Sequence, residues 1–254
     1  MATSFWSHLD ELRSVLIKCI IAWAVCAVAM FCFRDALFAL IFAPARPDFI
    51  TYRLLRHIPL GVSFNESALS LSPIAFINTH LAAQFAVHMQ VAALAGLVIA
   101  FPVIVAMCYR FIAPALYADE KRAAARIIGI GTLFFLFGVV LNYFVIFPFA
   151  FRFLATYQVQ PEVVNQISLE SYVSTLLILS LVMGLLFEMP LAAWSLSKAG
   201  LLHKQWLKQY RRHAVVVLVI LAAVITPTGD AFTLLLVALP LYLLYELSII
   251  LVKP

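Results

Sequence analysis

The sequence predicts an all-α integral membrane protein with six transmembrane helices, both termini in the cytoplasm and short fifth and sixth helices. Apolar residues make up 65% of the 254 residues and charged residues only 11%, whereas a soluble domain is nearer half apolar and a quarter charged. Residues 127–151 contain no Asp, Glu, Lys or Arg, and about 20 such residues cross a hydrocarbon layer. No hydrophilic block divides the chain, so we expect a single membrane domain over residues 1–254.

Six apolar runs supply the predicted spans, at about 15–34, 82–108, 126–147, 172–195, 214–225 and 231–245. As helices, the fifth and sixth runs would be only about 18 and 22 Å long. A hydrocarbon core is roughly 30 Å thick. Either the last hairpin thins the bilayer locally, or its helices extend past these apolar limits.

The remaining stretches are expected to lie outside the hydrocarbon layer. Apolar residues at three- and four-residue steps predict an amphipathic helix over residues 3–13, which would lie along the membrane interface. The polar, proline-containing segments 35–71 and 148–171 are expected to be irregular loops. Residues 196–213 form a third, basic loop.

The lysines and arginines predict the orientation. With six spans, twelve of the 17 Lys and Arg residues fall on the side that carries both termini. The other side holds five arginines and no lysine, namely Arg34, Arg46, Arg53, Arg56 and Arg152. The richer side is expected to be cytoplasmic.

Two adjacent acidic pairs, Asp10-Glu11 and Asp119-Glu120, lie on that otherwise positive side. Carboxylates and guanidinium groups form bidentate, charge-assisted hydrogen bonds. The two pairs therefore predict a negative patch for a cationic partner, provided that the first two spans pack together. Alternatively, Asp119 and Glu120 only cap the helix that follows Pro114.

Glu188 lies within the fourth run, about 24 Å from its start. An ionisable group at such a depth commonly faces a cavity or a partner and marks a functional site. The alternative is a protonated or hydrogen-bonded structural glutamate. Pro190 is expected to kink the helix beside it.

The sequence predicts no metal site, cofactor, catalytic residue or nucleic-acid partner, and hence no enzyme. The four cysteines form no CxxC pair and the six histidines no HExxH motif. Thr228-Gly229-Asp230 faintly suggests an intramembrane aspartyl protease, but no second buried Asp accompanies it. A secondary transporter of a small solute or ion remains an alternative, although it should show two repeated halves.

Taken in order, several motifs resemble the TatC family, the multi-spanning core subunit of the twin-arginine protein translocase. They are Ser7-His8-Leu9-Asp10-Glu11-Leu12-Arg13, Phe101-Pro102, Phe111 to Tyr117 with Glu120, Phe187-Glu188-Met189-Pro190, Thr226-Pro227 with Asp230, and Pro240 to Glu246. The resemblance implies a receptor for signal peptides with paired arginines. Such a receptor helps to move folded proteins across the cell inner membrane, or less commonly a thylakoid membrane, using the proton gradient.

The resemblance also implies roles for particular residues. Glu11 and Glu120 would bind the arginine pair, and Leu9, Arg13, Phe101 and Tyr117 would shape the same site. Glu188 would face the concave side of the spans. Single-span TatA- and TatB-type subunits would dock on the last hairpin at Thr226, Pro227 and Asp230, and the protein would self-associate in a larger complex. The chain departs from the family pattern at Met107, Tyr109, Arg110 and Leu234.

Overall fold

The computed structural model describes residues 5–57, 75–112, 121–160, 165–198, 200–226 and 230–252. Within these ranges, five helical stretches are long and apolar enough to cross a membrane: 9–31, 83–108, 128–156, 169–198 and 231–251. A helix lets a chain satisfy most of its backbone polar groups internally, as a hydrocarbon environment requires. The prediction of a helical membrane protein is therefore confirmed.

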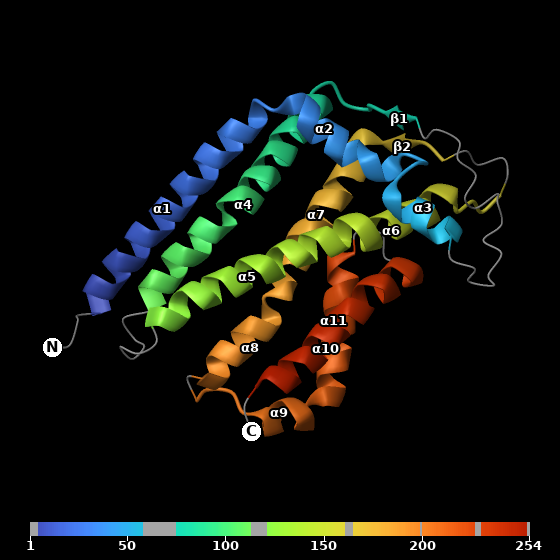
Figure 1. Ribbon diagram of the computed structural model, residues 1–254. Helices are drawn as coiled ribbons and strands as arrows, with labels where there is room; N and C mark the ends of the chain where they lie inside the picture. The colour runs from blue at the N-terminus through green and yellow to red at the C-terminus, as the bar shows by residue number, and fades with distance from the viewer. Residues whose placement is uncertain are drawn as a thin grey trace.

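The helices have two distinct ends (Figure 1). At the cap end lie α2 (Arg34–Phe42), α3 (Ile50–His57) and the short strands β1 (Phe76–Ile77) and β2 (Ile167–Ser168). At the opposite, terminal end lie the start of α1 (Phe5–Phe31) and the end of α11 (Ala231–Leu251). The two ends of the chain therefore lie on the same side of the bundle.

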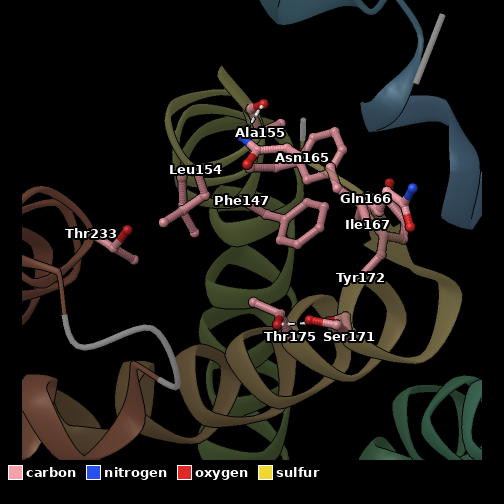
Figure 2. A pocket seen from close by; sticks show the side chains of 12 residues that line it. Phe147, Leu154, Ala155, Asn165, Gln166, Ile167, Ser171, Tyr172, Thr175 and Thr233 are labelled. Atoms are coloured by element: carbon pink, nitrogen blue, oxygen red, sulfur yellow. Dashed lines mark hydrogen bonds between the residues drawn. The ribbon is translucent and has the colours of Figure 1, made fainter. Parts of the chain in front are cut away.

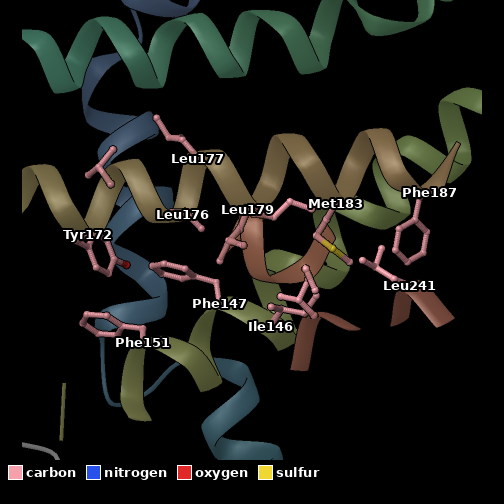
Figure 3. Packing of buried hydrophobic residues seen from close by; sticks show 14 of the residues in the cluster. Ile146, Phe147, Phe151, Tyr172, Leu176, Leu177, Leu179, Met183, Phe187 and Leu241 are labelled. Carbon is pink, nitrogen blue, oxygen red and sulfur yellow. The ribbon is translucent and has the colours of Figure 1, made fainter. Parts of the chain in front are cut away.

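The core lies where α7 (Leu169–Phe187) packs against its neighbours. Figure 3 shows Leu176, Leu179 and Met183 of α7 meeting Ile146 and Phe147. All five side chains are at most 1% exposed. Glycine allows a particularly close approach beside this cluster, since a Cβ added at Gly138 would lie 2.5 Å from the Met183 carbonyl oxygen.

The third span is longer than predicted. α5 (Lys121–Leu141) continues through a π-helical turn, η4 (Asn142–Ile146), into α6 (Phe147–Thr156). Pro148 was expected to begin a loop, but it lies directly after the π-helical turn inside a continuous helix. The irregular hydrogen bonding of that turn accommodates the missing N–H. The predicted end at residue 147 and the loop over residues 148–156 are therefore wrong.

The predicted loop over residues 35–71 is also largely helical where it is described. It contains α2, a 3₁₀ turn at Ala43–Ala45 and α3. Two residues of each cap-end loop then pair as parallel strands, with Phe76 opposite Ile167 and Ile77 opposite Ser168. At the other end, the basic loop 196–213 contains α9 (Lys204–Gln209).

Other helix limits differ as well. α1 is continuous, so the amphipathic residues predicted as a separate helix over 3–13 are its first turns. α4 (Ala83–Ile112) contains the second span, and the fourth consists of α7 and α8 (Met189–Lys198). α11 has 21 residues and is not short, because it continues past the predicted end at residue 245. α10 (Arg211–Ile225) has 15 residues, about 22 Å, so the predicted fifth span is indeed short.

Buried tyrosines join the cap to the core. The Tyr52 hydroxyl of α3 lies 3.0 Å from the Pro44 carbonyl oxygen and 3.1 Å from that of Pro148, while Tyr172 of α7 donates to Ile41 at 2.8 Å. Burial raises the pKa of Tyr52, an effect that the nearby Arg152 guanidinium partly offsets. These bonds fix α2 and α3 against α6 and α7.

Candidate functional site

The opening motif lies on the first turns of α1 at the terminal end. Leu9, Glu11 and Arg13 all have exposed side chains. Leu9 and Arg13 are four residues apart and share one face of the helix. Glu11 lies about 200° round the helix from each of them. The structure therefore places these predicted site residues at one end but on two faces of α1.

The packing of α1 against α4 determines what lies near Glu11. Phe31 stacks on His88 with ring centroids 4.0 Å apart near the cap, and Cys19 Sγ lies 3.8 Å from Met107 Sδ nearer the terminal end. The two helices are thus antiparallel. From the level of Cys19 and Met107, Glu11 is about 12 Å further along α1 and Ile112 about 7.5 Å further along α4. Measured along the helix axes, Glu11 consequently lies a few ångströms beyond the level of Ile112, the last residue of α4.

Tyr117 and Glu120 lie outside the described residues. They belong to the stretch between Ile112, where α4 ends, and Lys121, where α5 begins. The predicted contact of Glu11 and Glu120 around one arginine pair is therefore not tested by the structure.

Phe101 is not at the surface. It is 7% exposed and stacks on the fully buried Phe135 of α5, with ring centroids 3.6 Å apart and planes at 11°. Such a short centroid distance with near-parallel planes is a face-to-face arrangement, so the stabilisation comes from burial of the two rings rather than from a favoured stacking geometry. Any contribution of Phe101 to a peptide site is thus indirect, through the placement of α4 against α5.

Glu188 forms the break between α7 and α8, and Pro190 lies in the first turn of α8. Its side chain turns toward Gly131 of α5, where an added Cβ would lie 3.2 Å from Oε2. The Oε1 atom is buried and has no protein hydrogen-bond partner. Glu188 therefore brings an ionisable group into a stretch, 169–198, that is long and apolar enough to cross a membrane.

The polar residues of the last hairpin have local structural roles. Thr226 is 3% exposed and its hydroxyl donates to Ala222 O at 2.9 Å. Asp230 caps α11 by accepting a 2.7 Å hydrogen bond from Thr233 N. Pro227 lies outside the described residues. Leu234, a departure from the family pattern, packs against the apolar core.

The sequence did not predict the ion pair at the terminal end. Arg211, at the start of α10, pairs with Glu246 of α11, with Arg211 Nε 2.6 Å from Oε1. Glu246 was expected to end the last span, but α11 continues through it to Leu251. The residues are 35 positions apart, so local sequence gives no signal for the contact.

In the described part of the chain, no three His, Cys, Asp or Glu side chains gather where they could hold a metal ion. The cysteines Cys19, Cys26, Cys32 and Cys108 are free thiols.

Comparisons with known proteins agree with the motifs. The model of the family described as Sec-independent protein translocase protein (TatC) matches residues 7–240. A TatC protein of Blattabacterium is 34% identical over 250 residues, covering 96% of this chain and 93% of its own length. One from Deinococcus radiodurans is 34% identical, covering 97% and 84%.

Two solved structures of the twin-arginine translocase receptor TatC have the same fold. One is 32% identical, with a TM-score of 0.76 over 96% of this chain and 97% of that one. The other, determined in DDM, is 31% identical, with a TM-score of 0.78 over 97% and 100%. Because the family model and the relatives match most of the chain and the solved structures share its fold, the chain belongs to the TatC family, the Sec-independent protein translocase components of the twin-arginine system.

Proposed function

We propose that the chain binds signal peptides with paired arginines through Glu11 and Glu120 at the terminal end, as a receptor for folded cargo. The observation that carries the proposal is the position of Glu11. It is exposed and lies just beyond the end of α4, where the segment leading to Glu120 begins. Two carboxylates there would match two guanidinium groups in charge and in hydrogen-bonding geometry.

The other predicted residues support this site in different ways. Leu9 and Arg13 share the second exposed face of α1, where Leu9 offers an apolar contact to the peptide. Phe101 positions α4 by stacking on Phe135. Tyr117, which lies outside the described residues, is proposed to contribute to the same peptide site.

The terminal end is proposed to face the cytoplasm across a bacterial inner membrane. The start of α1 and the end of α11 lie at this end, and twelve of the 17 basic residues were assigned to that side. α10 would be the sixth crossing of a single domain, 1–254. The bacterial sources of the relatives favour the inner membrane over a thylakoid membrane.

Glu188 is proposed to act after peptide capture, in the step driven by the proton gradient. Its buried Oε1 lacks a protein partner. Such a group is energetically costly, so its presence calls for an explanation, and a functional role is one. Glu188→Gln should keep peptide capture at the wild-type level while export of a folded cargo falls. Normal export by this variant would make Glu188 a structural residue.

Single-span TatA- and TatB-type subunits are proposed to dock on the last hairpin, near Thr226, Pro227 and Asp230. α10 exposes Val216, Val217, Ile220 and Val224, each at least 58% exposed. An apolar partner helix or lipid must cover such a surface. Self-association of the chain within a larger complex belongs to the same proposal.

Site-specific crosslinking of a twin-arginine signal peptide in native membranes tests the binding site. Glu11→Gln and Glu120→Gln should each weaken binding by about tenfold, the effect expected for one charge-assisted hydrogen bond. Glu170→Gln is the matched control, because it removes an exposed carboxylate at the opposite, cap end, outside the predicted acidic patch. Crosslinks at full strength in both glutamine variants would reject the site.

Salt provides a second, independent test. Added salt screens exposed charges strongly, so affinity for the peptide should fall as ionic strength rises. A Lys-Lys peptide keeps the charges but loses the bidentate geometry. Salt-independent binding, or equal affinity for the two peptides, would point to an apolar contact instead.

A further inference from the structure

A pocket of about 280 Å³ opens near the cap end, between α6, α7 and the start of α11. Figure 2 shows Thr233 of α11 at one side of the pocket, facing Leu154 of α6, and Tyr172 at the other side, with Phe147 between. Asn165 and Gln166, just before β2, border the pocket. None of the proposed signal-peptide residues lines it.

The lining would suit an uncharged ligand with an apolar part. Phe147, Phe151, Leu154 and Tyr172 form an apolar wall. The polar groups that line the pocket are hydroxyls and amides, and no described lining residue carries a formal charge. A phosphate or carboxylate bound in the pocket would be expected to have a cationic partner, so an anionic headgroup is disfavoured inside it.

One hydrogen-bond donor in the lining lacks a partner. Thr233 is 1% exposed and its Oγ1 has no hydrogen-bond partner. Two neighbouring donors are already used: Thr175 donates to Ser171 O at 2.8 Å, and the Asn165 amide donates to Ala155 O and Tyr157 O. Gln166 and Ser171, which also line the pocket, are exposed, so water can serve their polar groups. A buried hydroxyl without an acceptor is unfavourable, so Thr233 indicates that a ligand supplies a carbonyl or similar oxygen.

The position of the pocket identifies a source for that oxygen. Its lining includes the last turns of α6 and the first turns of α7 and α11, at the cap-end limits of three stretches long enough to cross a membrane. Such limits lie where hydrocarbon meets the polar interface. There, a phospholipid presents ester carbonyls directly above its acyl chains.

We propose that this pocket binds one phospholipid. An ester carbonyl oxygen accepts a hydrogen bond from Thr233 Oγ1, and the first part of the acyl chain lies against Leu154 and Phe147. The charged headgroup stays outside the pocket, toward the aqueous phase. This proposal does not depend on the signal-peptide site.

Two synthetic lipids test the hydrogen bond directly: a diester phosphatidylethanolamine and its diether analogue, which has the same headgroup and matched chains but lacks the carbonyls. The full chain is purified in detergent, exchanged into an equal mixture of the two lipids, and the lipids that remain bound are counted by native mass spectrometry. We expect the wild type to retain the diester about fivefold more, a ratio that corresponds to one net hydrogen bond.

Substitutions of Thr233 complete the test. Thr233→Val should abolish the preference, and Thr233→Ser, which restores the hydroxyl, should recover it. Thr132→Val is the control, because its hydroxyl bonds to Ile128 O of its own helix and lies outside the pocket. Equal retention of both lipids by the wild type would overturn the proposal. So would a preference that persists in Thr233→Val, or occupation of the pocket by a second copy of the chain.

Discussion

The cap end and the terminal end are held together by different kinds of interaction. At the cap, Tyr52 and Tyr172 donate buried hydrogen bonds to main-chain carbonyls of other segments. At the terminal end, the Arg211–Glu246 pair joins α10 to α11, and the Arg211 side chain is 53% exposed. Water and salt compete with the second kind of contact and not with the first.

The difference indicates that the two ends have different structural roles. A cap fixed by buried hydrogen bonds keeps the helices in register. The terminal end can then present charged side chains to water without carrying the stability of the fold. Substitutions at the cap should therefore change stability, whereas those at the terminal end should change ionic contacts.

The largest expected effect is that of Tyr172→Ala. The ring is 2% exposed and contacts Phe147, Phe151 and Phe76. Removing a buried aromatic side chain costs about 3–5 kcal/mol. Thermal unfolding in detergent should show a large drop for this variant. Tyr157→Ala is the control, because Tyr157 is at the same end but 61% exposed; similar losses in both variants would contradict the comparison.

Tyr52→Phe should have a smaller effect, since it keeps the ring and removes the hydroxyl. The Pro44 and Pro148 carbonyls would lose their shared donor, at a cost of about 1–3 kcal/mol. The free energy of unfolding in detergent measures this loss. Tyr210→Phe, on an exposed residue of the terminal end, should change nothing measurable. A stable Tyr52→Phe protein would mean that water replaces the hydroxyl.

Gly131→Ala tests the region between the two ends. An added Cβ would crowd Glu188 Oε2 at 3.2 Å and Leu191 Cδ2 at 3.1 Å, both ends of flexible side chains. We expect the carboxyl group to turn away, with a loss of stability below about 1 kcal/mol. Labelling of Glu188 by an apolar carbodiimide, followed by peptide mass spectrometry, should change severalfold.

Gly129→Ala is the matched control for that experiment. It makes the same substitution two residues away on the same helix, where nothing lies within 4 Å of an added Cβ. Its labelling should equal that of the wild type. If both variants label alike, Gly131 does not position the Glu188 carboxyl.

The smallest expected effect is that of Arg211→Gln. Because the pair with Glu246 is exposed on the arginine side, the melting temperature should fall only slightly, and the difference from wild type should vanish at high salt. Arg212→Gln, on the neighbouring exposed residue, controls for the lost charge. A large, salt-independent drop in melting temperature would mean that this contact stabilises the fold as the cap-end hydrogen bonds do.

The sequence predicted most spans because each depends on local composition. The second run was placed at 82–108, and α4 occupies Ala83–Ile112. Predictions failed where distant residues decide the outcome. Pro148 does not end the third span, because the π-helical turn before it carries the helix onward. Glu246 does not end α11, which continues to Leu251, and its partner Arg211 is 35 positions away in the sequence.

For the candidate site, too, the sequence predicted the features that depend on local motifs and missed those that depend on distant contacts. The motif order pointed to the family and to Leu9, Glu11 and Arg13, which are exposed together at one end of α1. It did not show that Phe101 is buried against Phe135. Nor did it suggest Thr233, whose importance comes from an unpartnered hydroxyl beside a pocket built by three helices.

By itself, the sequence determined that the chain is a helical membrane protein and, through ordered motifs, that it resembles the TatC family. Hydrocarbon forces every apolar run of sufficient length to satisfy its own backbone, so composition alone identifies such a helix. Only the tertiary structure decided which side chains are buried, which helices break and where a pocket forms. Those outcomes depend on contacts between residues far apart in the chain, such as Tyr172 with Ile41 and Arg211 with Glu246.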